Sequence, residues 1–188
     1  SKPIFEYLKD NKWAFTEKVD GTNIRIYWDG KTIKFGGRTA AANIPAVLVD
    51  HLRQTFTDDK MRAKFGEAEA CLYGEGCGAK IQAGGGNYKA DGQMFVLFDV
   101  LIGRWWLERK DVEDVAACLT IPVVPVVLKG TLSDAENNVM GGMESFWGNF
   151  NSEGLVARPL VEVFDRRGDR VIVKMKTKHY SKIKVAAR

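Results

Sequence analysis

The 188-residue sequence contains few cysteines and histidines and no long apolar run. Its three cysteines, Cys71, Cys77 and Cys118, form no Cys-x-x-Cys pair. This argues against a disulfide or zinc framework and favours a reducing, cytoplasmic compartment. Two histidines leave little scope for a His-rich metal site or a Ser-His-Asp triad. No apolar run approaches the roughly 20 residues of a membrane span, and the N-terminus lacks the apolar stretch of a signal peptide, so we expect no membrane partner.

The formal net charge is +4, from 28 basic and 24 acidic residues, which by itself indicates little about a partner. Basic residues gather at the C-terminal end, in "DRRGDRVIVKMKTKHYSKIKVAAR" (165–188). Such a segment suits a polyanion, either a phosphate group or a nucleic acid. It is equally typical of a solvated edge strand whose lysines prevent aggregation, so the charge leaves both interpretations open.

Composition and patterning predict an α+β fold with antiparallel sheets. With 45% hydrophobic residues the chain can bury a sizeable core, and its length argues for a single domain over 1–188. Alternating strands on either side of an Asp-Gly turn predict a hairpin over 23–37. Helices are expected at 44–65, 110–120 and 132–142, the last with Ser133 as N-cap. Further strands are expected at 13–17, 68–76, 93–103, 123–130, 153–159 and 169–176, so hairpins dominate over βαβ units.

Lys18 is the first candidate for chemistry. It follows the apolar stretch "WAFTE" and precedes an Asp-Gly turn at Asp20 and Gly21, which predicts a lysine at the tip of a strand. A lysine attacks as a nucleophile only when it is neutral, and the ordinary lysine pKa is about 10.4. Burial or neighbouring cations must therefore lower the pKa of such a residue. By itself, this stretch is more often a surface hairpin flanked by an ordinary lysine.

Polar residues recur at strand ends along the rest of the chain. Glu75 lies between glycines in "YGEGCGAKIQ", so the backbone can approach a ligand closely. Asp99 interrupts the apolar strand "FVLFDV", where an unpaired carboxylate would be costly. Lys174 and Lys176 share one strand face in "VIVKMK". Together these residues predict a cleft with carboxylates, cations and one candidate nucleophile. The complete set is Arg38, Glu75, Asp99, Glu153, Lys174 and Lys176.

Six stretches in order, "EKVDGTN", "GGR", "YGEGCGAKIQ", "FVLFDV", "SEGLVARP" and "VIVKMK", resemble the signatures of the covalent nucleotidyltransferase superfamily. This superfamily comprises ATP-dependent DNA ligases, RNA ligases and mRNA capping enzymes. The pattern runs from Lys18 to Lys176 and covers most of the chain. Asn23 and "GEGCGAKIQ" are similar to the RNA ligase 2 family, whereas DNA ligases and capping enzymes usually carry Arg at the Asn23 position. Asp20 departs from the phage-like members, which often have His there.

The resemblance implies an α+β nucleotidyltransferase (adenylation) domain in which antiparallel sheets form an ATP cleft flanked by helices. It implies an ATP-dependent RNA ligase that acts in three steps. A lysine takes AMP from ATP, the AMP passes to a 5′-phosphate, and a 3′-OH displaces it to seal the strand. The implied cofactors are ATP and Mg²⁺ or Mn²⁺, and the implied partner is RNA with 5′-phosphate and 3′-OH ends, such as a nicked duplex. We expect a monomer, with neither an OB nor a helical C-terminal domain in 1–188.

The resemblance also implies which residues do the chemistry. Lys18 is the expected nucleophile, and Lys174 and Lys176 are expected to neutralise the α-phosphate as charge develops on it. Glu153 is expected to hold a hydrated divalent cation, which keeps most of its waters and so needs few carboxylates.

A second group of residues is expected to bind the nucleotide. Asn23 and Arg38 would contact phosphate or ribose, and Glu75 the ribose hydroxyl. Phe98 would stack on the adenine, with Phe95 as a rival on the same strand. Glu17 is also expected to contact the nucleotide. Asp20 and Asp99 are expected to line other parts of the cleft.

Three alternatives stay open at this point. A small ATP-dependent DNA ligase carries the same signatures, and Asn23 is what favours RNA. A capping guanylyltransferase would form its adduct with GTP only. A non-catalytic module that binds nucleotides or RNA ends is a different class of protein, but a binder has no need of a nucleophile.

Overall fold

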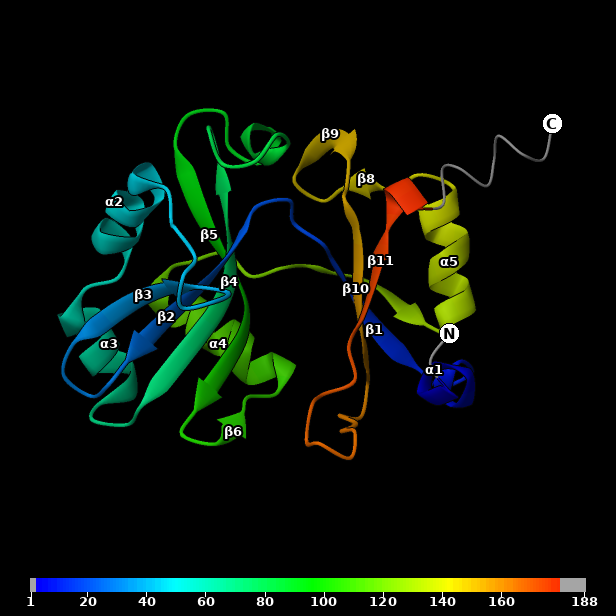
Figure 1. Ribbon diagram of the computed structural model, residues 1–188, viewed down its shortest axis with the longest axis horizontal. Helices are drawn as coiled ribbons and strands as arrows, with labels where there is room; N and C mark the ends of the chain where they lie inside the picture. The colour runs from blue at the N-terminus through cyan, green and yellow to red at the C-terminus, as the bar shows by residue number, and fades with distance from the viewer. Residues whose placement is uncertain (1–2, 180–188) are drawn as a thin grey trace. The chain divides into compact units, whose positions relative to one another are not determined.

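The computed structural model describes residues 3–179, which form two compact units (Figure 1). The first unit consists of residues 3–19 and 125–179, and the second of residues 20–124. Each unit has its own antiparallel sheet and its own helices, so the predicted α+β class is confirmed. No helix among residues 3–179 is long and apolar enough to cross a membrane.

A five-stranded antiparallel sheet with the order β3-β2-β4-β5-β6 forms the centre of the second unit. Its strands are β2 (Thr22–Trp28), β3 (Ile33–Gly37), β4 (Ala70–Gly78), β5 (Gln93–Ile102) and β6 (Trp105–Trp106). The other elements are α2 (Ala46–Thr55), α3 (Asp58–Phe65), the short 3₁₀ turn η1 (Gly85–Asn87) and α4 (Arg109–Leu119).

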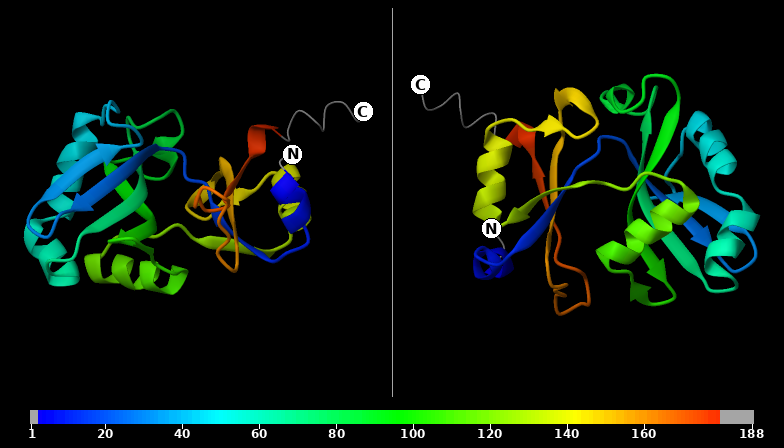
Figure 2. Two further views of the ribbon diagram at one scale, coloured as in Figure 1. Left: turned by 60° about the horizontal axis from the view of Figure 1, so that its bottom comes forward. Right: turned by 180° about the vertical axis from the view of Figure 1, so that it is seen from behind.

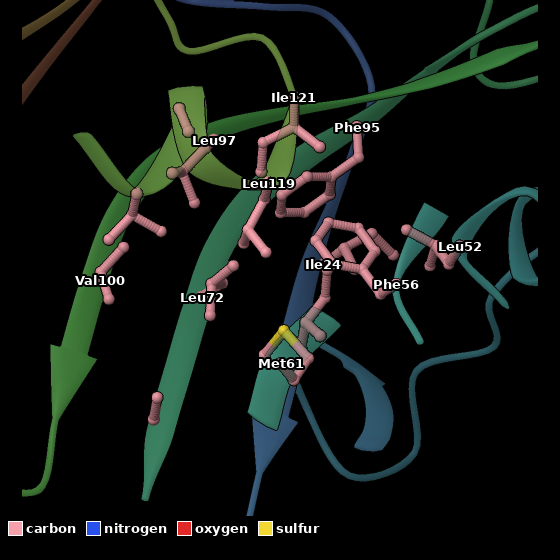
Figure 3. Close-up of a cluster of buried hydrophobic side chains, with 14 of the residues drawn as sticks. Ile24, Leu52, Phe56, Met61, Leu72, Phe95, Leu97, Val100, Leu119 and Ile121 are labelled. Carbon is pink, nitrogen blue, oxygen red and sulfur yellow. The ribbon is translucent and has the colours of Figure 1, made fainter. Parts of the chain in front are cut away.

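The core of the second unit lies between one face of this sheet and the helices. Alternate strand residues such as Ile24 and Leu72 point into it and meet Leu52 of α2, Met61 of α3 and Leu119 of α4 (Figure 3). All five side chains are at most 3% exposed. Because strand side chains alternate between faces, Asn23 and Arg25 of β2 and Glu75 of β4 lie on the opposite face of the sheet.

A four-stranded antiparallel sheet with the order β11-β10-β1-β7 forms the first unit, with α5 packed beside it (Figure 2). Trp13 and Phe15 of β1 are fully buried in its core, and Trp13 donates a hydrogen bond from Nε1 to the Leu8 carbonyl, 3.0 Å away. The sheet strands are β1 (Trp13–Glu17), β7 (Val126–Gly130), β10 (Gly154–Pro159) and β11 (Val173–Lys176). The other elements are α1 (Pro3–Leu8), α5 (Leu132–Met140) and the hairpin of β8 (Glu144–Ser145) and β9 (Gly148–Asn151).

Two of the three expected helices differ from the prediction by more than one residue, whereas the helix expected over 110–120 spans Arg109–Leu119. The helix expected over 44–65 is two helices, and Thr57 caps the second by accepting a hydrogen bond from the Lys60 backbone N–H at 3.3 Å. Ser133 is not the N-cap of α5, because Thr131 takes that position. The Thr131 hydroxyl accepts from the Asp134 N–H at 3.2 Å, and the Asp134 carboxylate accepts from the Thr131 N–H at 2.8 Å. This reciprocal capping box satisfies two helix-end donors, which a cap at Ser133 would leave open.

Candidate functional site

Three strands of the first unit bring Lys18, Glu153 and Lys176 together. Lys18 follows β1 directly, and its backbone N–H donates to the Gly154 carbonyl at 2.9 Å. Gly154 in turn lies opposite Lys176 in the β10–β11 register. The Lys18 ammonium donates to Glu153 Oε2 at 2.5 Å, and the Lys176 ammonium lies 2.7 Å from Glu153 Oε1. Lys18 and Lys176 thus share the Glu153 carboxylate, although they lie 135 residues before it and 23 residues after it in the sequence.

Electrostatics keep the Glu153 carboxylate ionised. Its partial burial disfavours the charged form, but the hydrogen bonds from Lys176 and Lys18 outweigh that cost and hold the pKa of Glu153 below its ordinary value. The side chains of Lys18 and Glu153 are 17% and 18% exposed, so solvent screens this pair only partly. In the described geometry, the side-chain nitrogen of Lys18 is therefore held by a carboxylate.

Lys174 lies two residues before Lys176 on β11, with the buried Met175 between them. The alternation of strand side chains therefore puts both lysines on one face, with Lys174 exposed. A ligand that bears several negative charges would meet two adjacent cations along this strand.

Glu17 occupies a different environment from its neighbour Lys18. Its carboxylate is 1% exposed and accepts hydrogen bonds at both oxygens. Ser145 Oγ donates to Oε1 at 2.6 Å, and the Phe146 backbone N–H donates to Oε2 at 2.7 Å. The side chain therefore anchors the β8–β9 hairpin, a function that the sequence did not suggest, and contact between Glu17 and a nucleotide stays a prediction.

In the second unit, Asn23 and Glu75 lie directly opposite each other in the β2–β4 register. Opposed side chains on one sheet face lie about 4.5–5.5 Å apart at Cβ, so these two form one polar pair. Gly21 is required beside them, since a β-carbon there would collide with the Gly76 carbonyl oxygen. Arg38 follows β3 and is exposed. The Asp20 backbone N–H donates to the Tyr88 hydroxyl at 3.2 Å, which ties the start of this unit to the glycine-rich loop.

A β-bulge in β5 places the two candidate stacking residues, Phe95 and Phe98, in different environments. Leu97 pairs with Gly74 and Asp99 with Tyr73, so Phe98 is the extra residue on β5. Phe95 is 1% exposed and packs edge-on against Phe56, with ring centroids 5.3 Å apart, so it belongs to the core. Phe98 is half-buried and lies outside that core cluster. Because bulges re-aim side chains and are common beside active sites, Phe98 remains the candidate for stacking.

The same bulge explains why an aspartate occurs in this apolar strand. Leu97 and Val100 both lie in the core, three residues apart, whereas strict alternation would have put Asp99 there. Asp99 is 3% exposed and lies opposite Tyr73. Burial, Cys71 and Asp99 all contribute to raising the pKa of Tyr73 to about 12, so its hydroxyl is protonated at neutral pH.

The residues present fit a divalent cation only through a single carboxylate. Within residues 3–179, no group of three His, Cys, Asp or Glu side chains could hold a metal ion. Glu153 offers the oxygen ligands that Mg²⁺ and Mn²⁺ prefer, and both of its oxygens already bind cationic groups. A single carboxylate is compatible with a largely hydrated ion, which is what the resemblance implies for Glu153, and the metal role of Glu153 stays a prediction.

Solved structures of RNA ligases share this fold. Naegleria gruberi RNA ligase with PPi matches with a TM-score of 0.71 at 23% identity, over 99% of this chain and 55% of that one. A mutant of the same ligase with ATP and Mn matches with a TM-score of 0.73 at 22% identity, over 96% and 54%. The chain thus spans about half the length of these ligases. A search of curated proteins found no match.

The fold is therefore that of a nucleotidyltransferase of the RNA ligase type. The family model described as RNA ligase matches residues 11–176, which is most of the sequence. The chain belongs to the RNA ligase family, as the ordered signatures had suggested.

Proposed function

We propose that this chain is an ATP-dependent RNA ligase that carries AMP on Lys18 and joins a 5′-phosphate to a 3′-OH. The observation that carries the proposal is the shared carboxylate: Glu153 binds Lys18 at 2.5 Å and Lys176 at 2.7 Å. Such an arrangement positions a lysine nitrogen, a second cation and an ionised acid around one point. Family membership and the solved structure of a similar RNA ligase with ATP and Mn support the same reaction.

Each of the three proposed steps breaks one bond to phosphorus and forms another. First, Lys18 Nζ loses a proton and forms a bond to the α-phosphorus of ATP, while the bond to the bridging oxygen breaks and pyrophosphate leaves. Second, an oxygen of the RNA 5′-phosphate attacks that phosphorus, and the bond to Lys18 breaks. Third, the 3′-hydroxyl oxygen attacks the 5′-phosphorus, AMP leaves, and a phosphodiester remains.

The chain's own residues contribute mainly position and charge to these steps. Glu153 holds the Lys18 nitrogen in place, and this pair must separate before the nitrogen can attack. Lys176 and Lys174 are the cations proposed to balance the charge that develops on the α-phosphate. A divalent cation at Glu153 would add positive charge at the phosphate and favour the neutral amine.

Nucleotide recognition is proposed for the second unit. Glu75 would accept hydrogen bonds from the ribose hydroxyls, and its neighbour Asn23 would contact ribose or phosphate. Arg38, exposed after β3, has the planar fork that suits phosphate. Phe98 at the bulge would stack on the adenine.

Covalent labelling tests the proposal. We expect wild-type protein, incubated with labelled ATP and Mg²⁺ or Mn²⁺, to acquire one AMP per chain and to release pyrophosphate. Lys18→Ala should abolish the label. Lys34→Ala is a matched control, since Lys34 is also paired with a carboxylate, Asp29, but lies in an exposed hairpin. No adduct in wild type, or an adduct that survives Lys18→Ala, would refute the proposal.

The preferred substrate is proposed to be RNA, on the strength of Asn23 and the family match. Nicked duplexes of RNA, RNA–DNA hybrid and DNA, supplied to the same adenylated protein, separate the alternatives. Faster sealing of RNA ends is expected, and preferential sealing of all-DNA nicks would favour a DNA ligase instead. A monomeric state and a cytoplasmic location remain predictions from the sequence.

A further inference from the structure

The turn of the β8–β9 hairpin presents an aromatic ring to solvent. Phe146 follows the last residue of β8 and is 70% exposed, which makes it one of the most exposed large apolar side chains of residues 3–179. Its neighbour Trp147 packs edge-on against it, with ring centroids 5.8 Å apart and planes 83° apart. One ring thus supports the other, and a face of Phe146 stays open.

Two hydrogen bonds fix this turn to the residue before the nucleophile, and a third braces the turn itself. Both oxygens of the buried Glu17 carboxylate are occupied, by Ser145 Oγ at 2.6 Å and by the Phe146 N–H at 2.7 Å. The Trp147 N–H donates to the same Ser145 hydroxyl at 3.0 Å. A buried carboxylate with charge-assisted bonds holds its partners firmly. Because Glu17 precedes Lys18, the ring has a defined position relative to the lysine.

The other end of the hairpin leads directly to the acid that pairs with Lys18. The Ser152 N–H donates to the Met143 carbonyl at 2.9 Å, which closes the base of the hairpin one residue before Glu153. In Figure 1, β9 continues straight into β10. The hairpin is therefore bound at its turn to Glu17, the residue before Lys18, and closed at its base by Ser152, the residue before Glu153, all within the first unit.

Cations belong to the same unit as this aromatic turn. Lys176 shares Glu153 with Lys18, and the Thr177 N–H donates to the Glu153 carbonyl at 3.0 Å. Lys178, which is exposed, comes next along the chain. Proteins bind single nucleic-acid strands with this combination of a stacking ring and cations along the backbone path. A protein or second-copy partner would call for a larger apolar area than one ring, so the chemistry favours a nucleic acid.

We propose that Phe146 is a stacking platform for a nucleobase close to the 5′-phosphate of the RNA end that receives AMP from Lys18. This inference rests on the proposed function and deepens it, since it assigns an RNA-binding residue to the same site. In this arrangement the ring holds the base while the cations hold the phosphates. Glu17 then positions the stacking ring relative to the nucleophile, in addition to stabilising the turn.

The test measures stacking and adenylation separately. The probe is a 5′-phosphorylated oligoribonucleotide with 2-aminopurine placed in turn at each position, because stacking on an aromatic ring quenches this base. Binding is measured without ATP, so it does not depend on catalysis. The variants are Phe146→Ala, Phe146→Leu and Phe146→Trp, and Tyr7→Ala is the matched control. Tyr7 is 83% exposed in the same unit, but it lies on α1 next to the opposite end of β1.

Wild type should quench the probe most strongly near its 5′ end. Phe146→Ala should weaken RNA binding by roughly 5- to 100-fold, which is the range expected for one stacked base. Phe146→Leu should weaken it by a similar factor, whereas Phe146→Trp should retain the affinity of wild type. The slope of affinity against salt should not change, whereas Lys178→Ala should reduce it, since only a lost cation alters counterion release. Lysyl-AMP formation and the melting temperature of Phe146→Ala should match wild type.

Several results would overturn the inference. One is unchanged RNA affinity in Phe146→Ala, or an equal loss of RNA affinity in Tyr7→Ala. Another is a quenching maximum at the 3′ end of the probe. A raised KM for ATP in Phe146→Ala would mean that the ring contacts the nucleotide cofactor instead. A change of oligomeric state in Phe146→Ala would show that the ring covers a second copy. If wild type binds RNA through Phe146 but forms no adduct, the ligase proposal fails while the stacking site stands.

Discussion

The Lys18 ammonium lies 2.5 Å from one oxygen of Glu153, while Lys176 lies 2.7 Å from the other. Two cations thus share one carboxylate, and each of the three side chains is less than one-third exposed. Glu153 thereby fixes the position of the candidate nucleophile Lys18. Glu153 is therefore expected to affect both the pH dependence of stability and the rate of adduct formation.

The first prediction concerns acid stability. The hydrogen bonds from Lys176 and Lys18 hold the pKa of Glu153 below its ordinary value of 4.5, so the unfolded chain binds this proton more readily than the folded chain. The stabilisation is present above pH 4.5 and is lost as pH falls through the lowered pKa of the folded state. Glu153→Gln should be less stable than wild type at pH 7, and the difference should shrink between about pH 5 and pH 3. Thermal melts across this range measure it, and parallel curves would contradict it.

A second prediction separates the two phenylalanines of β5. Phe95→Ala should cost about 3–5 kcal/mol of unfolding free energy, because it empties a packed core position against Phe56. Phe98→Ala should cost less, since Phe98 is only half-buried, but it should raise the KM for ATP in lysyl-AMP formation by roughly tenfold. Denaturant titration and single-turnover labelling give the two quantities. Phe98→Leu is the control for lost bulk, and an unchanged KM in both Phe98 variants would exclude stacking there.

Much of the fold and part of the site followed from the sequence. The hairpin over 23–37 was predictable because Asp29 closes its turn by accepting from the Lys31 and Thr32 N–H groups, at 3.0 and 2.8 Å. The ordered signatures predicted that Lys18 and Glu153 belong to one site, and the β1–β10 pairing brings them together.

Other features depend on tertiary structure and could not be predicted from local patterns. Period-two reasoning cannot detect the bulge at Phe98, because the extra residue shows itself only through the pairing of β5 with β4. The hydrogen bonds of Glu17 to the β8–β9 turn join residues 128 and 129 positions apart, and no local pattern announces them. The cap at Thr131, by contrast, is local. The sequence does contain its capping-box pattern, Thr-x-x-Asp from Thr131 to Asp134, but the neighbouring Ser133 was chosen as the cap instead.

A third prediction uses the cysteines as probes of the second unit. Cys118 is exposed on α4, whereas Cys77 is buried on β4. Burial, followed by the nearby Glu75 and Asp20, raises the pKa of the Cys77 thiol to about 12, so its thiolate is scarce at pH 8. Burial likewise raises the pKa of the half-buried Cys71. A thiol reagent should modify Cys118 first, Cys71 more slowly, and Cys77 only on unfolding.

Peptide mass spectrometry at successive times assigns each modified cysteine. Cys118→Ser removes the fast phase and serves as the control. Labelling of Cys77 at the rate of Cys118 in folded protein would show that β4 does not lie in the sheet as described.

The last prediction concerns Ser152, the residue before Glu153. It is 3% exposed, and its hydroxyl has no hydrogen-bond partner within the described structure. A buried hydroxyl without a partner costs free energy, so Ser152→Ala should leave stability unchanged or raise it by about 1 kcal/mol. Gly154→Ala, two residues further on, should destabilise severely, because its φ is +145° and a β-carbon there would collide with the Met175 carbonyl. Urea titrations of both variants give the comparison. A marked loss of stability in Ser152→Ala would mean that its hydroxyl has a partner in solution, and the described surroundings of Ser152, next to Glu153, would need revision.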